Sequence, residues 1–198
     1  SKMALMGSGE PSTIALLGIL FLIVALGFKA SAAPFHVWTP DVYDGSPTAF
    51  TPFMASIAKV AIFAAFIHLF HASFAGLAGR WHIIIIAIIV LTLLIGNVTA
   101  VYQQSVKRML AYSSISHAGF ILVGVEAAGH MSGDGVATSM NYLAIYTVLV
   151  MGSFAIVLAM SGNTDGETNL SDFKGLAKRR PALALAFTVL LFAQAGVP

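Results

Sequence analysis

The chain has 198 residues, of which 58% are hydrophobic and only 9% are charged, and its formal net charge is +2. A soluble domain carries about 25% charged residues, so this composition excludes an ordinary water-exposed surface. The lack of cysteine excludes disulfides, thiol chemistry and cysteine-ligated metal centres, and so small a net charge gives no indication of nucleic-acid binding.

Six apolar stretches follow one another, each close to the length of about 20 residues that crosses a bilayer. They lie near 12–30, 51–71, 82–101, 109–128, 139–160 and 181–198, with a polar loop over 161–180. The pattern predicts an all-α, polytopic transmembrane helical bundle that forms one membrane-embedded unit over 1–198. A soluble protein with an unusually apolar core is the alternative, which runs of this length disfavour. Because neither end of the chain shows a natural boundary, we expect a fragment of a larger membrane protein.

The first stretch carries a lysine, Lys29, shortly before a proline, Pro34. Proline lacks an amide hydrogen and its ring clashes with the carbonyl four residues back, here that of Ala30, so the helix is expected to break just after Lys29. Backbone groups freed at membrane depth are tolerated where they line a watery cavity, and such breaks beside charge are typical of ion sites. The alternative is that Lys29 extends from the helix end to the lipid headgroups.

The second stretch places Lys59 deep inside an apolar run. It lies eight residues in, about 12 Å from the start at 1.5 Å per residue. Ser56, Phe63 and Phe66 share its side of a helix. An ionisable side chain at this depth usually faces a protein-lined path. Lysine can both take up and release protons, so we predict a proton relay here, with a purely structural role as the alternative.

The fourth stretch begins with a polar stripe, KRMLAYSSISH. Lys107 and Ser114 share a helix face, and His117 follows one turn later. Lys107 and His117 are about 15 Å apart along the axis, so hydroxyls and water would have to connect them. Histidine is a common proton relay. The alternatives are that Lys107 anchors the helix at the interface and that His117 hydrogen-bonds between helices.

The other polar residues give no enzymatic pattern. Asp41 and Asp44 are interpreted as helix-cap and loop acids. No metal-ligand spacing such as HExxH occurs, so we expect no metal site. The histidines whose spacing does not match such a motif are His36, His68, His71, His82 and His130.

If the six stretches cross the membrane one after another, most of the basic residues fall in the loops on one side. One set of loops carries only Lys2 and Arg80, whereas the other set is basic. The positive-inside rule places this basic set on the cytoplasmic or equivalent side. Its members are Lys107, Arg108, Lys174, Lys178, Arg179 and Arg180.

Two long runs carry a resemblance to a known family: GFKASAAPFHVWTPDVYDGSPT from Gly27, and KRMLAYSSISHAG from Lys107. The chain resembles the proton-pumping, antiporter-like subunits of respiratory complex I, NADH–quinone oxidoreductase. The WTPDVY element favours the subunit N branch, which is subunit 2 in mitochondria and the B subunit in plastid-type enzymes. With the closing AFTVLLFAQAGVP, the resemblance covers most of the chain from Gly27 onward.

The resemblance implies a partial antiporter-like inverted-repeat fold with an interrupted helix. Lys29 matches the family's lysine in its broken seventh helix and Lys59 the lysine of the eighth. Lys107 and His117 match polar residues of the central hydrophilic axis. This implies a proton-translocating subunit of the redox enzyme, embedded in a bacterial plasma membrane or an organellar energy-transducing membrane.

The same resemblance implies where the redox chemistry takes place. Flavin, iron–sulfur clusters and quinone are expected in partner subunits, and no cofactor in this chain. A subunit of a multi-subunit sodium/proton antiporter or of a membrane-bound hydrogenase is the alternative, and so is a scaffold whose lysines have lost their role.

Overall fold

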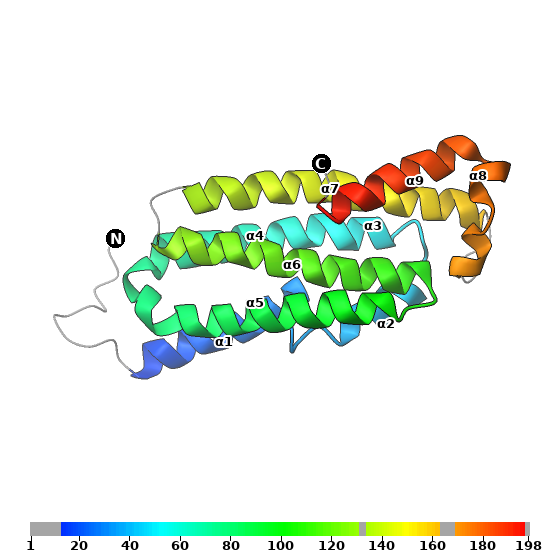
Figure 1. The fold of residues 1–198 in the computed structure, drawn as a ribbon. Helices are drawn as coiled ribbons and strands as arrows, with labels where there is room; N and C mark the ends of the chain where they lie inside the picture. Colours follow the sequence, from blue (N-terminus) through cyan, green and yellow to red (C-terminus); the bar gives the residue numbers. More distant parts are fainter. Residues whose placement is uncertain (1–12, 131–133, 163–168, 197–198) are drawn as a thin grey trace.

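The computed structural model describes residues 13–130, 134–162 and 169–196 and shows long helices packed side by side (Figure 1). Five helical segments are long and apolar enough to cross a membrane. They are α1 (Thr13–Ala30), the run Thr51–Ser73, α5 (Ala78–Val101), α6 (Val106–His130) and α7 (Asp134–Ser161). The predicted all-α membrane bundle is confirmed. The sixth span stays a prediction, because α9 (Pro181–Gln194) is an apolar helix of 14 residues.

The first membrane segment is interrupted where Pro34 predicts it. Helix α1 ends at Ala30, Ser31 has a positive φ of 64°, and the Ala33–Pro34 peptide is cis. A short helix, α2 (Trp38–Gly45), then continues the chain. The Ala33 amide donates a hydrogen bond to Thr92 Oγ1 of α5, at 2.9 Å, which fixes the break to a neighbouring helix.

The second membrane segment is less regular than the apolar run predicts. It consists of α3 (Thr51–Phe53), a π-helical turn η1 (Met54–Ala58), α4 (Lys59–Ile67) and a second π-helical turn η2 (His68–Ser73). The first π-helical turn ends immediately before Lys59. Turns of this kind are rare and are found frequently at functional sites.

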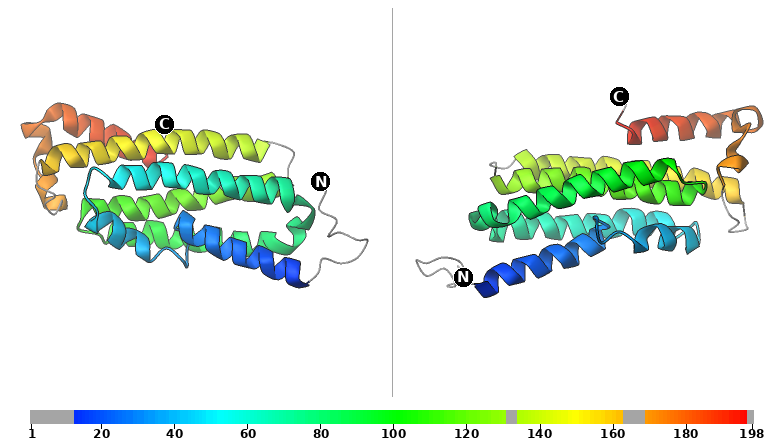
Figure 2. Two further views of the ribbon diagram at one scale, coloured as in Figure 1. Left: turned by 180° about the vertical axis from the view of Figure 1, so that it is seen from behind. Right: turned by 60° about the horizontal axis from the view of Figure 1, so that its bottom comes forward.

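Helix α6 lies inside the bundle, in contact with both α5 and α7 (Figure 2). It is the most buried of the five segments and also the least hydrophobic. Helix α5, with its run of isoleucines, is largely exposed. This inversion is expected in a bilayer, because lipid solvates apolar side chains and polar ones gain by facing protein.

Two clusters of buried hydrophobic side chains form the core of the bundle. One gathers α1, α4, α5 and the second half of α6 around Phe63, Phe66 and Trp81. The other gathers α2, α6, α7 and α9 around Tyr43 and Phe154. The two clusters hold α4, α6 and α7 together around the polar side chains described below.

The turn between α5 and α6 lies at the same end of the bundle as the basic loop before α9 (Figure 1). The Leu170 amide donates to the Gln104 carbonyl at 2.9 Å, which joins the two. This loop contains η4 (Leu170–Phe173) and α8 (Leu176–Arg179). The remainder of the predicted polar loop, 163–168, lies outside the described residues.

Candidate functional site: a buried lysine among three membrane helices

Lys59 lies inside the bundle, with only 2% of its surface exposed. Its ammonium nitrogen donates a hydrogen bond to the carbonyl oxygen of Ser114 in α6. It also lies over the ring of Tyr146 in α7, 5.7 Å from the centroid, within the range of cation–π attraction. A charge removed from water is costly unless groups such as these replace its hydration. Lys59 is therefore held by groups from two neighbouring helices.

The predicted neighbours of Lys59 are buried with it. Ser56, Phe63 and Phe66 are each exposed by 1% or less, which confirms that one helix side carries all four residues. The Ser56 hydroxyl donates to the Pro52 carbonyl of its own helix at 2.5 Å. The phenylalanines pack in a hydrophobic cluster with side chains of α1 and α5, whereas the polar contacts of the lysine come from α6 and α7.

A hydroxyl pair continues the site from Lys59 across to α7. Ser114 Oγ and the Tyr146 hydroxyl share a hydrogen bond of 2.8 Å. The Tyr146 hydroxyl also donates to the Ala55 carbonyl, at 3.0 Å, within the π-helical turn before Lys59. Tyr146 thus joins α7 to both α6 and the turn that carries the lysine. Hydroxyls of this kind can accept one proton while donating another.

His117 of α6 lies beside two tyrosines of α7. Its Nδ1 is 2.7 Å from the hydroxyl of Tyr142, and its ring lies 5.1 Å from the ring of Tyr146. The side chain is only 6% exposed. The structure therefore brings three residues predicted from sequence, Lys59, Ser114 and His117, into one cluster.

The two tyrosines of α7 were not predicted as site residues. Tyr142 and Tyr146 are four residues apart, so they share one helix face. That spacing is visible in NYLAIY, but an apolar run with tyrosines four apart equally describes a helix face turned to lipid headgroups. The sequence does not show which helix the two tyrosines face, so it does not identify them as site residues.

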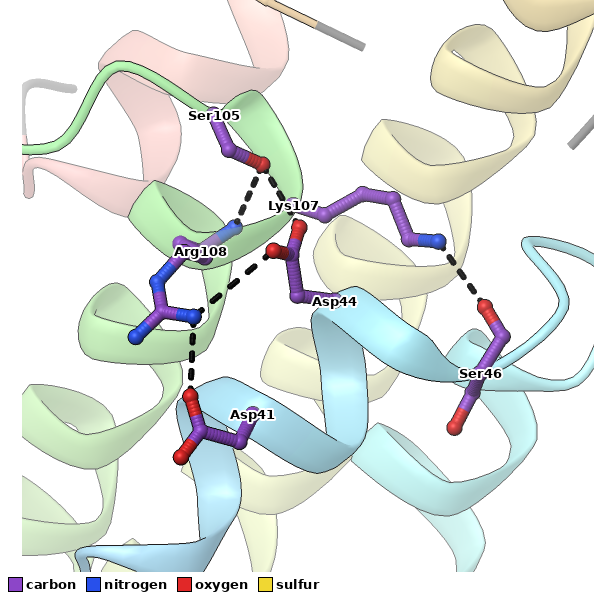
Figure 3. Close-up of polar contacts among 6 residues, drawn as sticks. All are labelled: Asp41, Asp44, Ser46, Ser105, Lys107 and Arg108. Carbon is purple, nitrogen blue, oxygen red and sulfur yellow. Dashed lines mark hydrogen bonds and ion pairs between the residues drawn. The ribbon is translucent and has the colours of Figure 1, made fainter. Parts of the chain in front are cut away.

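Lys107 lies at the start of α6 and points toward α2 (Figure 3). It is 4% exposed, and its ammonium donates to the Ser46 carbonyl at 2.8 Å. This contact joins the start of α6 to the residue that follows α2. The connection from Lys107 to His117 through hydroxyls and water along α6 stays a prediction.

Arg108, the residue after Lys107, forms ion pairs with two acids of α2. Arg108 lies 2.8 Å from Asp41 and 3.7 Å from Asp44. Asp44 also accepts a hydrogen bond from Ser105 at 2.8 Å (Figure 3). The interpretation of Asp44 as a loop acid is wrong, because it belongs to α2 and its carboxylate binds the start of α6. These contacts fix the second half of the interrupted helix against α6.

Lys29 is not part of this buried cluster. It lies in the last turn of α1 with its side chain exposed. Nearby, the hydroxyls of Ser31 and Thr39 are buried and have no hydrogen-bond partner among the described residues. Buried polar groups are usually satisfied by protein or by ordered water, so this break has the polarity that retains water.

Removing one hydroxyl tests whether Tyr146 joins the three helices. Tyr146→Phe removes the hydrogen bonds to Ser114 Oγ and to the Ala55 carbonyl, at an expected cost of about 1–3 kcal/mol in the free energy of unfolding. Tyr102→Phe is the matched control, because Tyr102 is 77% exposed and its change should stay within about 0.5 kcal/mol. Denaturant unfolding of the full-length protein in micelles measures both, and equal stabilities would contradict the assignment.

The fold and the cluster together define a class of protein. It is a polytopic helical membrane protein with an interrupted helix and basic side chains buried between helices, which is the architecture of ion-translocating proteins. Its membership of a family follows from the sequence. The profile of the family described as NADH:quinone oxidoreductase/Mrp antiporter, TM matches residues 1–198. The chain belongs to this family, and the predicted resemblance is confirmed.

Several curated relatives carry the name predicted from the two runs. NADH-quinone oxidoreductase subunit N 1 of Herpetosiphon aurantiacus is 44% identical over 192 residues, covering 97% of this chain and 38% of the relative. Subunit N of Nitrosomonas europaea is 40% identical over 185 residues, covering 93% of this chain and 38% of the relative. The chain thus spans about two fifths of the length of these relatives.

Solved structures show the same fold. A chain of respiratory complex I from Thermus thermophilus with bound aureothin matches with a TM-score of 0.78 and 36% identity, over 98% of this chain and 41% of that one. A chain of the Mrp complex from Dietzia sp. DQ12-45-1b matches with a TM-score of 0.81 and 25% identity, over 96% of this chain and 34% of that one.

Proposed function

We propose that the protein containing this chain translocates protons as a membrane subunit of NADH–quinone oxidoreductase. The observation that carries the proposal is Lys59, which is buried against α6 and α7 within a segment long and apolar enough to cross a membrane, and is joined to Ser114 and Tyr146. An ammonium in such a place is expensive and marks an ion or proton pathway. The higher identity to subunit N than to the Mrp chain favours the redox enzyme.

In this proposal Lys59 takes up and releases the proton, and water, hydroxyls and His117 connect it to the surrounding path. Lys29 and Lys107 would be further stations, one beside the interrupted helix and one at the start of α6. The electrons travel elsewhere: flavin, iron–sulfur clusters and quinone are expected in partner subunits, and this chain supplies no redox centre. Other membrane subunits would cover the exposed apolar faces.

The proposal includes an orientation. The start of α6 and the loop before α9 lie at one end of the bundle and together carry six of the ten lysines and arginines. The positive-inside rule assigns this end to the cytoplasm or to the equivalent compartment of an organelle. The membrane itself would be a bacterial plasma membrane or an organellar energy-transducing membrane.

A sodium/proton antiporter subunit is the second candidate, favoured by the high TM-score to the Mrp chain. One experiment separates the two. The full-length protein is purified with the subunits that accompany it, reconstituted into vesicles, and tested for proton movement driven by NADH oxidation or by a sodium gradient. NADH-driven proton movement that needs no sodium is expected. Proton movement driven only by sodium would replace the proposal with the antiporter.

A further inference from the structure

The last residue of α9, Gln194, reaches two neighbouring helices with one side chain. Its amide nitrogen donates to Ser153 Oγ at 2.6 Å and to the Leu149 carbonyl at 3.3 Å, both on α7. Its amide oxygen lies 3.4 Å from Ser113 Oγ of α6 and accepts from it. Ser153 is fully buried. Gln194 therefore ties the end of α9 to one turn of α7 and one turn of α6.

The turn of α6 that Gln194 reaches is the turn that holds Lys59. Ser113 directly precedes Ser114, whose carbonyl accepts from Lys59 and whose hydroxyl pairs with Tyr146. The anchored end of α9 is also a true helix end. The Gly196 amide donates to the Ala193 carbonyl only three residues back, at 3.1 Å, and Gly196 adopts a positive φ of 79°. A helix C-terminus, with its partial negative charge, thus lies beside the Lys59 cluster.

An amide cannot exchange protons as lysine or histidine does, but it has a direction: its oxygen only accepts and its nitrogen only donates. Gln194 therefore turns the Ser113 hydroxyl hydrogen toward α9. It also occupies Ser153 as an acceptor, which leaves the Ser153 hydroxyl hydrogen available for another acceptor such as water. The side chain sets the direction of two hydroxyls on adjacent helices.

We propose that Gln194 is a positioning residue of the proton path, which orients Ser113 and Ser153 and holds the end of α9 against the α6 turn that binds Lys59. This inference rests on the proposed function of the Lys59 cluster. Gln194 carries no proton itself. It extends the site to a fourth element, α9.

The test uses the whole enzyme in vesicles, with protons moved per NADH oxidised as the readout. Gln194→Leu removes both the donor and the acceptor and is expected to cause a several-fold loss of proton translocation at matched assembly. Gln194→Glu keeps the size but adds a titratable group, and is expected to shift the pH dependence of proton translocation away from that of the wild type. A merely structural role would alter assembly without either effect. Thr188→Val is the matched control, because this exposed α9 side chain donates only to its own helix, at Ala184.

The results of the Gln194 and Lys59 variants together show whether the role of Gln194, the proposed function, or both are correct. Loss in Gln194→Leu and in a Lys59 variant supports both the inference and the proposed function. Loss in the Lys59 variant alone overturns the role of Gln194 and leaves the function standing. Loss in neither overturns both. If Gln194→Leu does not assemble, Ser153→Ala removes one of the oriented hydroxyls alone, and unchanged translocation in that variant overturns the inference.

Discussion

Proton translocation through this subunit is expected to fall about a hundredfold when Lys59 is replaced by methionine, the lower range of what a positioned proton-transfer group contributes. Methionine keeps an unbranched apolar chain of similar length, so the packing against α6 and α7 should survive. The measurement is the number of protons moved per NADH oxidised by the assembled enzyme in vesicles. Assembly and NADH oxidation are measured in the same preparation, because a loss of either would lower proton movement indirectly.

Two further variants separate charge from proton exchange. Lys59→Arg keeps a positive charge, but arginine does not release its proton in proteins, so translocation should remain low. Lys178→Met is the matched control, because Lys178 is exposed on α8. Unchanged translocation in Lys59→Met, with normal assembly, would contradict the relay and leave this chain as a scaffold. Recovery in Lys59→Arg would show that only the charge is needed.

The burial of Lys59 could be predicted because its position in the middle of an apolar run is a local property of the sequence. The same holds for the break after α1, which Pro34 causes through its own backbone. The partners of Lys59 could not be predicted in this way. Ser114 lies 55 residues away, and the Tyr146 hydroxyl reaches a carbonyl 91 residues away. Contacts at such separations depend on which helices pack together, and no local pattern in the sequence indicates that packing.

Helix α5 shows a second limit of prediction from the sequence. Its isoleucine run predicts a membrane span but not its place in the bundle, because lipid and protein interior solvate such side chains almost equally well. The polar stripe of α6 is more informative, since serines, a lysine and a histidine gain most inside the bundle. In a membrane protein, the least hydrophobic span is therefore the better candidate for the centre. The structure bears this out for Ser114, Ser116 and His117, which are all buried.

Replacing Gly96 by valine is expected to lower the free energy of unfolding by about 3 kcal/mol or more, at or above the upper end of typical overpacking costs. A Cβ atom at Gly96 would lie 2.8 Å from the backbone nitrogen of Ser116 and 3.0 Å from its Cα. Those atoms belong to the backbone of α6, so only a separation of α5 from α6 relieves the clash. Small residues at such crossings allow membrane helices to approach closely. Denaturant unfolding of the full-length protein in micelles measures the loss.

The Gly96 clash also connects stability to the candidate site, because Ser116 precedes His117 on the helix that holds Lys59. Gly96→Ala is expected to cost about 1–3 kcal/mol and to lower proton translocation together with stability. Gly18→Ala is the control: nothing lies within 4 Å of its Cβ position, so the higher helix propensity of alanine should leave stability equal or raise it by up to about 1 kcal/mol. If Gly96→Ala were as stable as Gly18→Ala, α5 and α6 would not cross this closely. If Gly96→Ala lost stability but kept full translocation, the crossing would support the fold without controlling the position of His117.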